Sequence, residues 1–100
     1  MANMQAKVEL VTRIRNVLRE GGLVEMVVWR LPQPVPPSPH AFKYRLAYVV
    51  DGERVVGFDN ERGKGDHKHV GALECPYQFV DVDRLIDDFQ IEVETWNNAH

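Results

Sequence analysis

The spacing of apolar positions predicts strands over the first eighty residues and one helix after them. Residues 7–19 are ambiguous, because their apolar side chains fit both a helical stripe and the alternation of a strand. Five β-branched residues in this stretch of thirteen favour a strand, and Gly21–Gly22 suits a hairpin turn into a Val-rich strand over residues 23–30. We therefore predict a first hairpin here, with a helix over residues 7–19 as the open alternative.

A proline-rich connector follows this hairpin. Five prolines fall between residues 31 and 39, where they remove backbone donors and favour an extended path. We expect a stiff crossover that runs along the edge of the sheet.

The strongest local signal is a second hairpin, formed by residues 43–50 and 53–60 around Asp51-Gly52. This dipeptide is typical of a two-residue type I′ turn. With that turn Val50 pairs with Glu53, and counting back places Tyr44 opposite Asp59 and Lys43 opposite Asn60. One face then carries Tyr44, Leu46, Tyr48, Val55 and Asp59, and the other carries Lys43, Arg45, Ala47, Val49, Arg54, Val56, Phe58 and Asn60.

The last elements are a short strand and a helix. Residues 76–79 alternate as an edge strand that begins at a proline. Asp81 or Asp83 can cap the helix, whose apolar stripe recurs every three or four residues at Val82, Leu85, Ile86, Phe89, Val93 and Trp96. The expected fold class is α+β: one small domain over residues 1–100, with a twisted, mainly antiparallel sheet of about four to five strands and a C-terminal amphipathic helix packed on it.

Charge is distributed unevenly along the chain. The formal net charge is −3, yet residues 71–100 hold seven acidic side chains against Arg84 alone. Most of these acids fall on the solvated faces of the predicted helix, so the rest of the chain is slightly basic and a local site for nucleic acid stays open.

Other features of the composition concern compartment and redox chemistry. The single cysteine, Cys75, excludes an intramolecular disulfide, and we expect it to be buried. No apolar run reaches the roughly 20 residues of a membrane span, and the N-terminal segment lacks the hydrophobic region of a signal peptide. We therefore expect a soluble cytoplasmic protein.

The candidate chemistry is concentrated in residues 59–69. If the backbone is extended after Gly65, His67 and His69 share one face and Lys68 points to the other. Two imidazoles can act as general base and general acid on a phosphodiester near neutral pH, with Lys64 stabilising charge on the phosphoryl oxygens. This scheme requires neither a metal nor a cofactor.

Three other interpretations stay open. His67 and His69 can bind a divalent metal with Asp59 or Asp66 as third ligand, although the nearby lysines disfavour it. Gly63-Lys64-Gly65 can hold a phosphate, but the spacing and the Ser/Thr of a nucleotide-binding loop are missing. The same residues also suit a solvated surface loop.

Several motifs occur together and in order: Phe58-Asp59-Asn60, residues 63–69 (Gly-Lys-Gly-Asp-His-Lys-His) and residues 76–79 (Pro-Tyr-Gln-Phe). Through them, over roughly residues 23–93, the chain resembles the TumE toxin family. The resemblance implies a small α+β protein that is the toxin of a bacterial type II toxin–antitoxin pair. It also implies neutralisation by a helix-turn-helix antitoxin made from an adjacent gene.

Two functions from different classes are consistent with this resemblance. In the first, a ribonuclease, the catalytic residues are His67, His69, Lys64 and Asp59, and Asp59 orients an imidazole. The RNA contacts would be Lys43, Arg45, Asn60, Arg62 and Lys68. In the second, a module without turnover occupies nucleic acid or a protein partner through the same basic side chains. A homodimer is compatible with both, and no membrane partner is expected.

Overall fold

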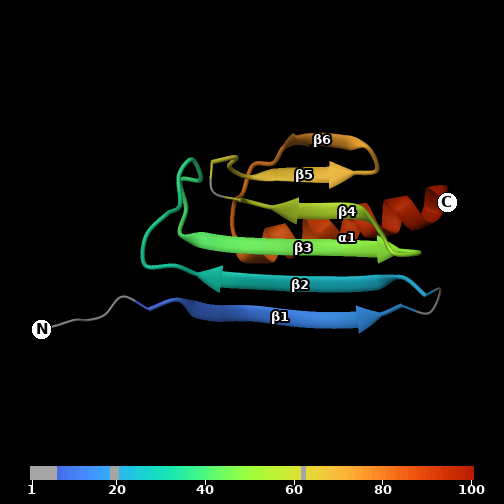
Figure 1. Cartoon of the computed structure of the whole chain (residues 1–100), viewed down its shortest axis with the longest axis horizontal. Coiled ribbons are helices and arrows are strands. Elements are labelled where there is room, and N and C mark those ends of the chain that lie inside the picture. The colour runs from blue at the N-terminus through green and yellow to red at the C-terminus, as the bar shows by residue number, and fades with distance from the viewer. Residues whose placement is uncertain (1–6, 19–20, 62) are drawn as a thin grey trace, which may run out of the picture.

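The computed structural model describes residues 7–18, 21–61 and 63–100 as one antiparallel sheet with a helix packed on it (Figure 1). The sheet has six strands, in the order of the sequence: β1 (Glu9–Val17), β2 (Leu23–Arg30), β3 (Phe42–Val50), β4 (Glu53–Asp59), β5 (His67–Val70) and β6 (Leu73–Pro76). The α+β class is confirmed. The expected four to five strands are corrected to six, because the histidine segment forms a further hairpin, β5–β6.

The ambiguous N-terminal segment is a strand. β1 pairs with β2 in antiparallel register, and the predicted hairpin is confirmed. Gly21 adopts a φ of +90°, which favours glycine, and a Cβ on Gly22 would lie 2.6 Å from the ring of Tyr48. β1 is an outer edge of the sheet and leaves several of its apolar side chains exposed.

The turn between β3 and β4 forms as predicted, but the register beyond it differs by one residue. Asp51 and Gly52 have φ values of +53° and +77°, as a type I′ turn requires, and Val50 pairs with Glu53. An irregularity follows between Tyr48 and Val49. Beyond it, Asp59 lies opposite Arg45 rather than opposite Tyr44.

Burial explains this shift. An extra residue in β4 turns Val56 and Phe58 to the same face as Tyr48 and Leu46, their new partners. Both side chains have an exposed fraction of 0% there, whereas the unshifted register would have placed them on the opposite face. The predicted face assignments of Val56, Phe58 and Asp59 were therefore wrong.

The proline-rich segment is not a crossover along the sheet edge. β2 and β3 are neighbours, so residues 31–41 form a long hairpin connection at one end of the sheet. This loop folds against the segment before β5, where the Gly63 N–H donates to the Pro36 carbonyl oxygen at 3.3 Å.

The last strand begins earlier than predicted. β6 ends at Pro76, and Tyr77 and Phe79 instead leave the sheet to pack against the aromatic core through Phe58 and Tyr44. β6 is the other outer edge of the sheet, as expected of the last strand. Cys75 lies in this edge strand and is exposed, so the expectation of a buried thiol was wrong.

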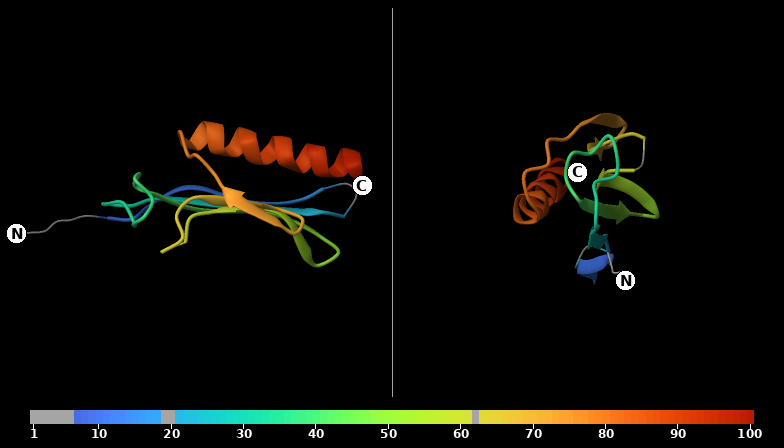
Figure 2. Two further views of the ribbon diagram at one scale, coloured as in Figure 1. Left: turned by 90° about the horizontal axis from the view of Figure 1, so that it is seen from above. Right: turned by 90° about the vertical axis from the view of Figure 1, so that its left-hand side faces the viewer.

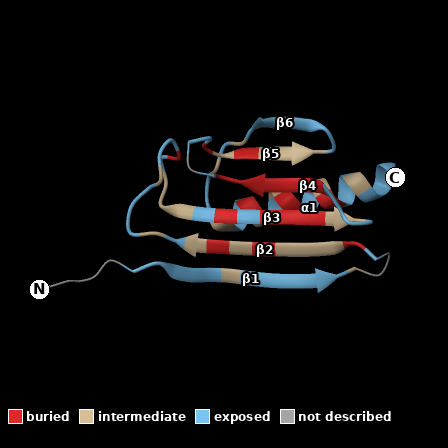
Figure 3. Ribbon diagram, in the orientation of Figure 1, coloured by how far each residue is buried: buried red, intermediate tan, exposed pale blue. Residues whose placement is uncertain are grey.

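Helix α1 (Val82–Ala99) is capped by Asp81, one of the two predicted caps, whose carboxylate accepts from the Arg84 N–H. Its apolar stripe packs across one face of the sheet, as Figure 2 shows, and Leu85, Phe89 and Val93 are buried there. The buried positions follow β3, β4 and the inner side of the helix (Figure 3). Within the part of the chain that the structure describes, no helix combines the length and apolar character needed to cross a membrane.

Replacing Phe89 by Ala should lower the free energy of unfolding by about 3–5 kcal/mol, because a fully buried ring that packs edge-on against Phe58 is lost. Ile91→Ala, on the exposed side of the same helix, should change it by less than about 0.5 kcal/mol. Denaturant titration followed by circular dichroism measures both. Equal effects of the two substitutions would contradict this packing.

Candidate active site

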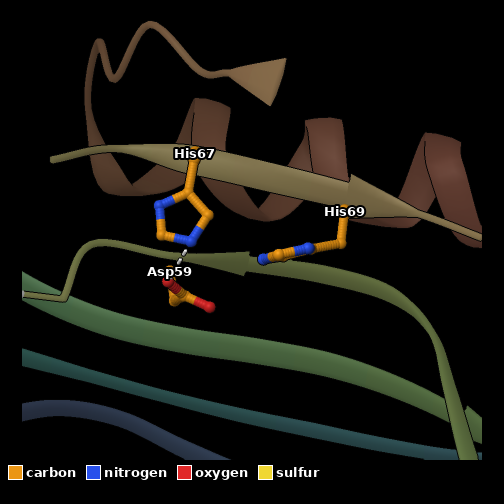
Figure 4. A group of neighbouring side chains, drawn as sticks. All are labelled: Asp59, His67 and His69. Atoms are coloured by element: carbon orange, nitrogen blue, oxygen red, sulfur yellow. Dashed lines mark ion pairs between the residues drawn. The ribbon is translucent and has the colours of Figure 1, made fainter. Parts of the chain in front are cut away.

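The face of the sheet turned away from α1, here called the open face, carries the predicted catalytic cluster. Asp59 is the last residue of β4 and pairs with His67, the first residue of β5, while His69 pairs with Gly57. Side chains of paired residues lie on the same face, so all three point to the open face (Figure 4). The prediction that His67 and His69 share a face, with Lys68 on the other, agrees with this register.

Asp59 and His67 form a close, buried contact. His67 Nε2 lies 2.8 Å from Asp59 Oδ1, and the side chains are 7% and 8% exposed. The two atoms are not aligned as a hydrogen bond, so both are buried without a hydrogen-bond partner. On the other side of the ring, Nδ1 lies 3.0 Å from the Gly65 carbonyl oxygen, to which an Nδ1–H can donate. Such a bond fixes the ring and directs Nε2 toward Asp59 and His69.

Glu74 is a member of the cluster that was not predicted as a site residue. Its Oε2 lies 3.4 Å from Nε2 of His67, 3.6 Å from Nε2 of His69 and 3.5 Å from Nζ of Lys64. The β5–β6 hairpin produces this arrangement by pairing His69 with Glu74. In the sequence, the sign of this hairpin was Gly71, a residue suited to a tight turn directly after the His-x-His strand. In the structure Gly71 adopts a φ of +59° at that turn.

Of the basic residues predicted to bind substrate, two lie on the open face. Arg45 pairs with Asp59 and is exposed, and Lys43, also exposed, is two residues away on the same strand. Lys68 points to the helix face instead, where its Nζ lies 2.7 Å from Glu92 Oε2. The structure thus separates Lys68 from the histidines.

The two remaining predicted contacts differ. Asn60 is only 2% exposed, and its side chain accepts from the Tyr44 N–H and donates to the Phe42 carbonyl oxygen. The amide therefore holds the start of β3 to the end of β4. Arg62 lies outside the described residues.

A second polar cluster lies beside the site. The Asp66 carboxylate accepts from Ser38 Oγ at 2.7 Å, and its Oδ2 lies 2.8 Å from Nε2 of His40. The hydroxyl therefore contacts the carboxylate rather than the imidazole, which is not the arrangement of an activated serine nucleophile. Of the two carboxylates considered beside His67 and His69, Asp59 is the one that the structure groups with them.

The chain matches one known protein family over most of its length. Residues 3–97 match the family model described as Toxin TumE. The chain belongs to the TumE toxin family. Membership indicates a toxin component of a toxin–antitoxin system, and such a toxin implies an antitoxin partner. The match includes β1, which lies before the residues 23–93 that carried the resemblance. Searches of curated proteins and of solved structures found no match.

In this TumE-family toxin, the environment lowers the pKa of His69 below its ordinary value of 6.5. Burial is the largest cause, followed by the positive charge of Arg54, while Glu74 acts in the opposite direction. A depressed histidine pKa favours the neutral ring at neutral pH. Its contribution to stability is present above about pH 6.5 and is lost as the pH falls through the folded-state value.

Two substitutions should move this pKa in opposite directions. Glu74→Gln removes the favourable negative charge and should lower the pKa of His69 further, whereas Arg54→Gln should raise it. Titration of the His69 ring protons by NMR measures both shifts, and His100 serves as an internal reference. Shifts of the same sign in the two variants would contradict this electrostatic account.

Proposed function

We propose that this TumE-family toxin cleaves RNA through metal-independent acid–base chemistry at His67 and His69, with Asp59 positioning the His67 ring. The observation that carries the proposal is the pair of imidazoles, which lie on one face of the sheet with ring centroids 5.0 Å apart. The toxin would act in the cytoplasm, where it meets RNA. Its neutralising partner would be the helix-turn-helix antitoxin that the family resemblance implies.

The reaction begins with the more exposed histidine. His69, whose lowered pKa favours the neutral ring, takes the proton of a ribose 2′-hydroxyl, and the 2′-oxygen attacks the adjacent phosphorus. The bond from phosphorus to the 5′-oxygen breaks, and that oxygen receives a proton from His67. The products are a 2′,3′-cyclic phosphate and a 5′-hydroxyl, so no redox partner or further reactant is needed.

The surroundings of His67 supply the remaining parts. His67 lines a surface pocket of about 320 Å³ together with Lys64 and Glu74, so a phosphate bound there would lie beside the Lys64 ammonium group and next to His67. Lys64 would stabilise the negative charge that develops on the phosphoryl oxygens. Asp59 acts as a positioning residue, because its buried carboxylate lies against Nε2 of His67.

Replacing either His67 or His69 by Gln should abolish toxicity on induced expression and reduce RNA cleavage by at least about 100-fold, since each removes one proton-transfer group. Growth curves and gel analysis of a labelled RNA measure the two effects. His100→Gln, at the exposed end of α1, is the matched control and should leave both unchanged.

The same variants distinguish a ribonuclease from a binding module. In a ribonuclease, the histidine variants keep their affinity for RNA and for the antitoxin while toxicity is lost. Parallel loss of toxicity and affinity would favour a module that only occupies its target. Unimpaired growth during soluble expression of the unaltered chain would contradict the toxin function itself.

One observation favours a second candidate, a divalent metal site. Ligand atoms of Asp59, His67 and His69 all lie within 4.8 Å of one another, and the Asp59–His67 contact lacks hydrogen-bond alignment. A cation bound between these atoms would satisfy both, and a backbone carbonyl on the far nitrogen is common for histidine ligands. The residues present therefore fit Zn²⁺ or Mn²⁺.

Removal of metal separates the two candidates. Acid–base cleavage should proceed at an unchanged rate after dialysis against a chelator, because both proton-transfer groups belong to the chain. Initial rates on labelled RNA before and after dialysis measure this. Loss of activity that zinc or manganese restores would contradict the acid–base scheme and establish the metal site.

A further inference from the structure

The open face carries an excess of unpaired positive charge. Each acid that the register places there has a cation within 4 Å: Glu25 lies 3.3 Å from Arg15, Asp59 3.9 Å from Arg54 and Glu74 3.5 Å from Lys64. Three cations on this face, Arg13, Lys43 and Arg45, have no carboxylate within that distance among residues 7–18, 21–61 and 63–100.

The strand register aligns these cations with the catalytic cluster. Arg13 pairs with Val27, Val27 with Arg45, Arg45 with Asp59 and Asp59 with His67, which gives one row across five strands. With neighbouring strands about 4.8 Å apart, Arg13 lies roughly 14 Å along this row from Asp59. The row leads from β1 directly into the site.

An aromatic side chain flanks the row. Trp29 pairs with Lys43 on the open face, is half-buried, and lies 5.7 Å from the Arg13 guanidinium carbon, measured from its ring centre. Cations that track a backbone, combined with an aromatic ring on which a base can stack, are the combination that binds single-stranded nucleic acid.

The opposite side of the molecule has the reverse charge. Figure 2 shows α1 covering one face of the sheet and leaving the other bare. The helix exposes Asp83, Asp87 and Glu94, which would repel a polyanion. Charge therefore favours the open face as the surface that receives RNA.

We infer that the open face is a binding track for single-stranded RNA, in which Arg13, Lys43 and Arg45 contact phosphates and Trp29 stacks on a base. The track extends the substrate from the cluster toward β1 and rests on the proposed ribonuclease function for its biological role. It adds Arg13 and Trp29, which neither the motifs nor the site geometry had assigned.

A binding assay tests the track apart from the chemistry. The probe is a short, fluorescent 2′-O-methyl oligoribonucleotide, which lacks the 2′-hydroxyl nucleophile and is not cleaved. The double variant Arg13→Gln/Arg45→Gln should weaken binding by at least about tenfold and reduce the slope of log affinity against log salt by about 1.4, for two phosphate contacts to a single strand. Trp29→Leu should weaken binding by about tenfold.

The matched control removes the same charge elsewhere. In the control double variant Arg30→Gln/Arg84→Gln, Arg30 packs on Phe42 on the helix side of the sheet and Arg84 lies on α1. It should keep nearly full affinity. Thermal unfolding of each variant confirms that the fold persists.

Three outcomes would overturn the track. Equal losses of RNA affinity in the two double variants would show that binding depends only on net charge. Tighter binding of a duplex of the same sequence would exclude a single-strand surface. Unchanged RNA affinity with lost antitoxin binding would make the face a protein interface. Normal binding without cleavage of unmodified RNA would leave the track standing and contradict only the proposed chemistry.

Discussion

The one-residue shift in the pairing of β3 and β4 determines both the core under α1 and the polar cluster on the open face. It turns Val56 and Phe58 toward α1, which completes the aromatic and aliphatic core. Because side chains alternate along a strand, the same shift turns Asp59 to the open face. The same shift therefore sets both the packing of the core and the position of the Asp59 carboxylate.

Local patterns predicted much of the fold. The Asp51–Gly52 turn and the cap at Asp81 depend on neighbouring residues and formed as expected. The bulge beyond that turn did not follow from local pattern, since its cause is the burial of Phe58 against α1, more than twenty residues later in the chain. Pairing counted outward from a turn holds only until tertiary packing makes an irregularity favourable.

The candidate site was likewise predictable where it depends on local spacing, and not where it depends on strand pairing. The His-x-His spacing within an extended segment was enough to place His67 and His69 on one face, and strand geometry alone explains why Lys68 faces away. Glu74 and Arg13 enter only through strand pairing, because one lies across a hairpin from His69 and the other lies three strands from Asp59. Asn60 misled sequence reasoning because a polar residue beside an active site can also serve the backbone, as its bonds to the start of β3 show.

The proline-rich loop, residues 31–41, supports the segment that precedes β5. Lys64 comes from the segment before β5, in which Glu61, Gly63 and Lys64 are exposed. The loop supports this segment at two points, through Gly63 and through the Ser38 and His40 contacts to Asp66. Gly65 approaches the loop so closely that a Cβ there would lie 3.1 Å from Pro37, and its φ of +78° already favours glycine. Prolines that restrict the chain before folding reduce the entropy lost when both segments are ordered, so the loop helps to keep Lys64 and the carbonyl of Gly65 in place beside His67.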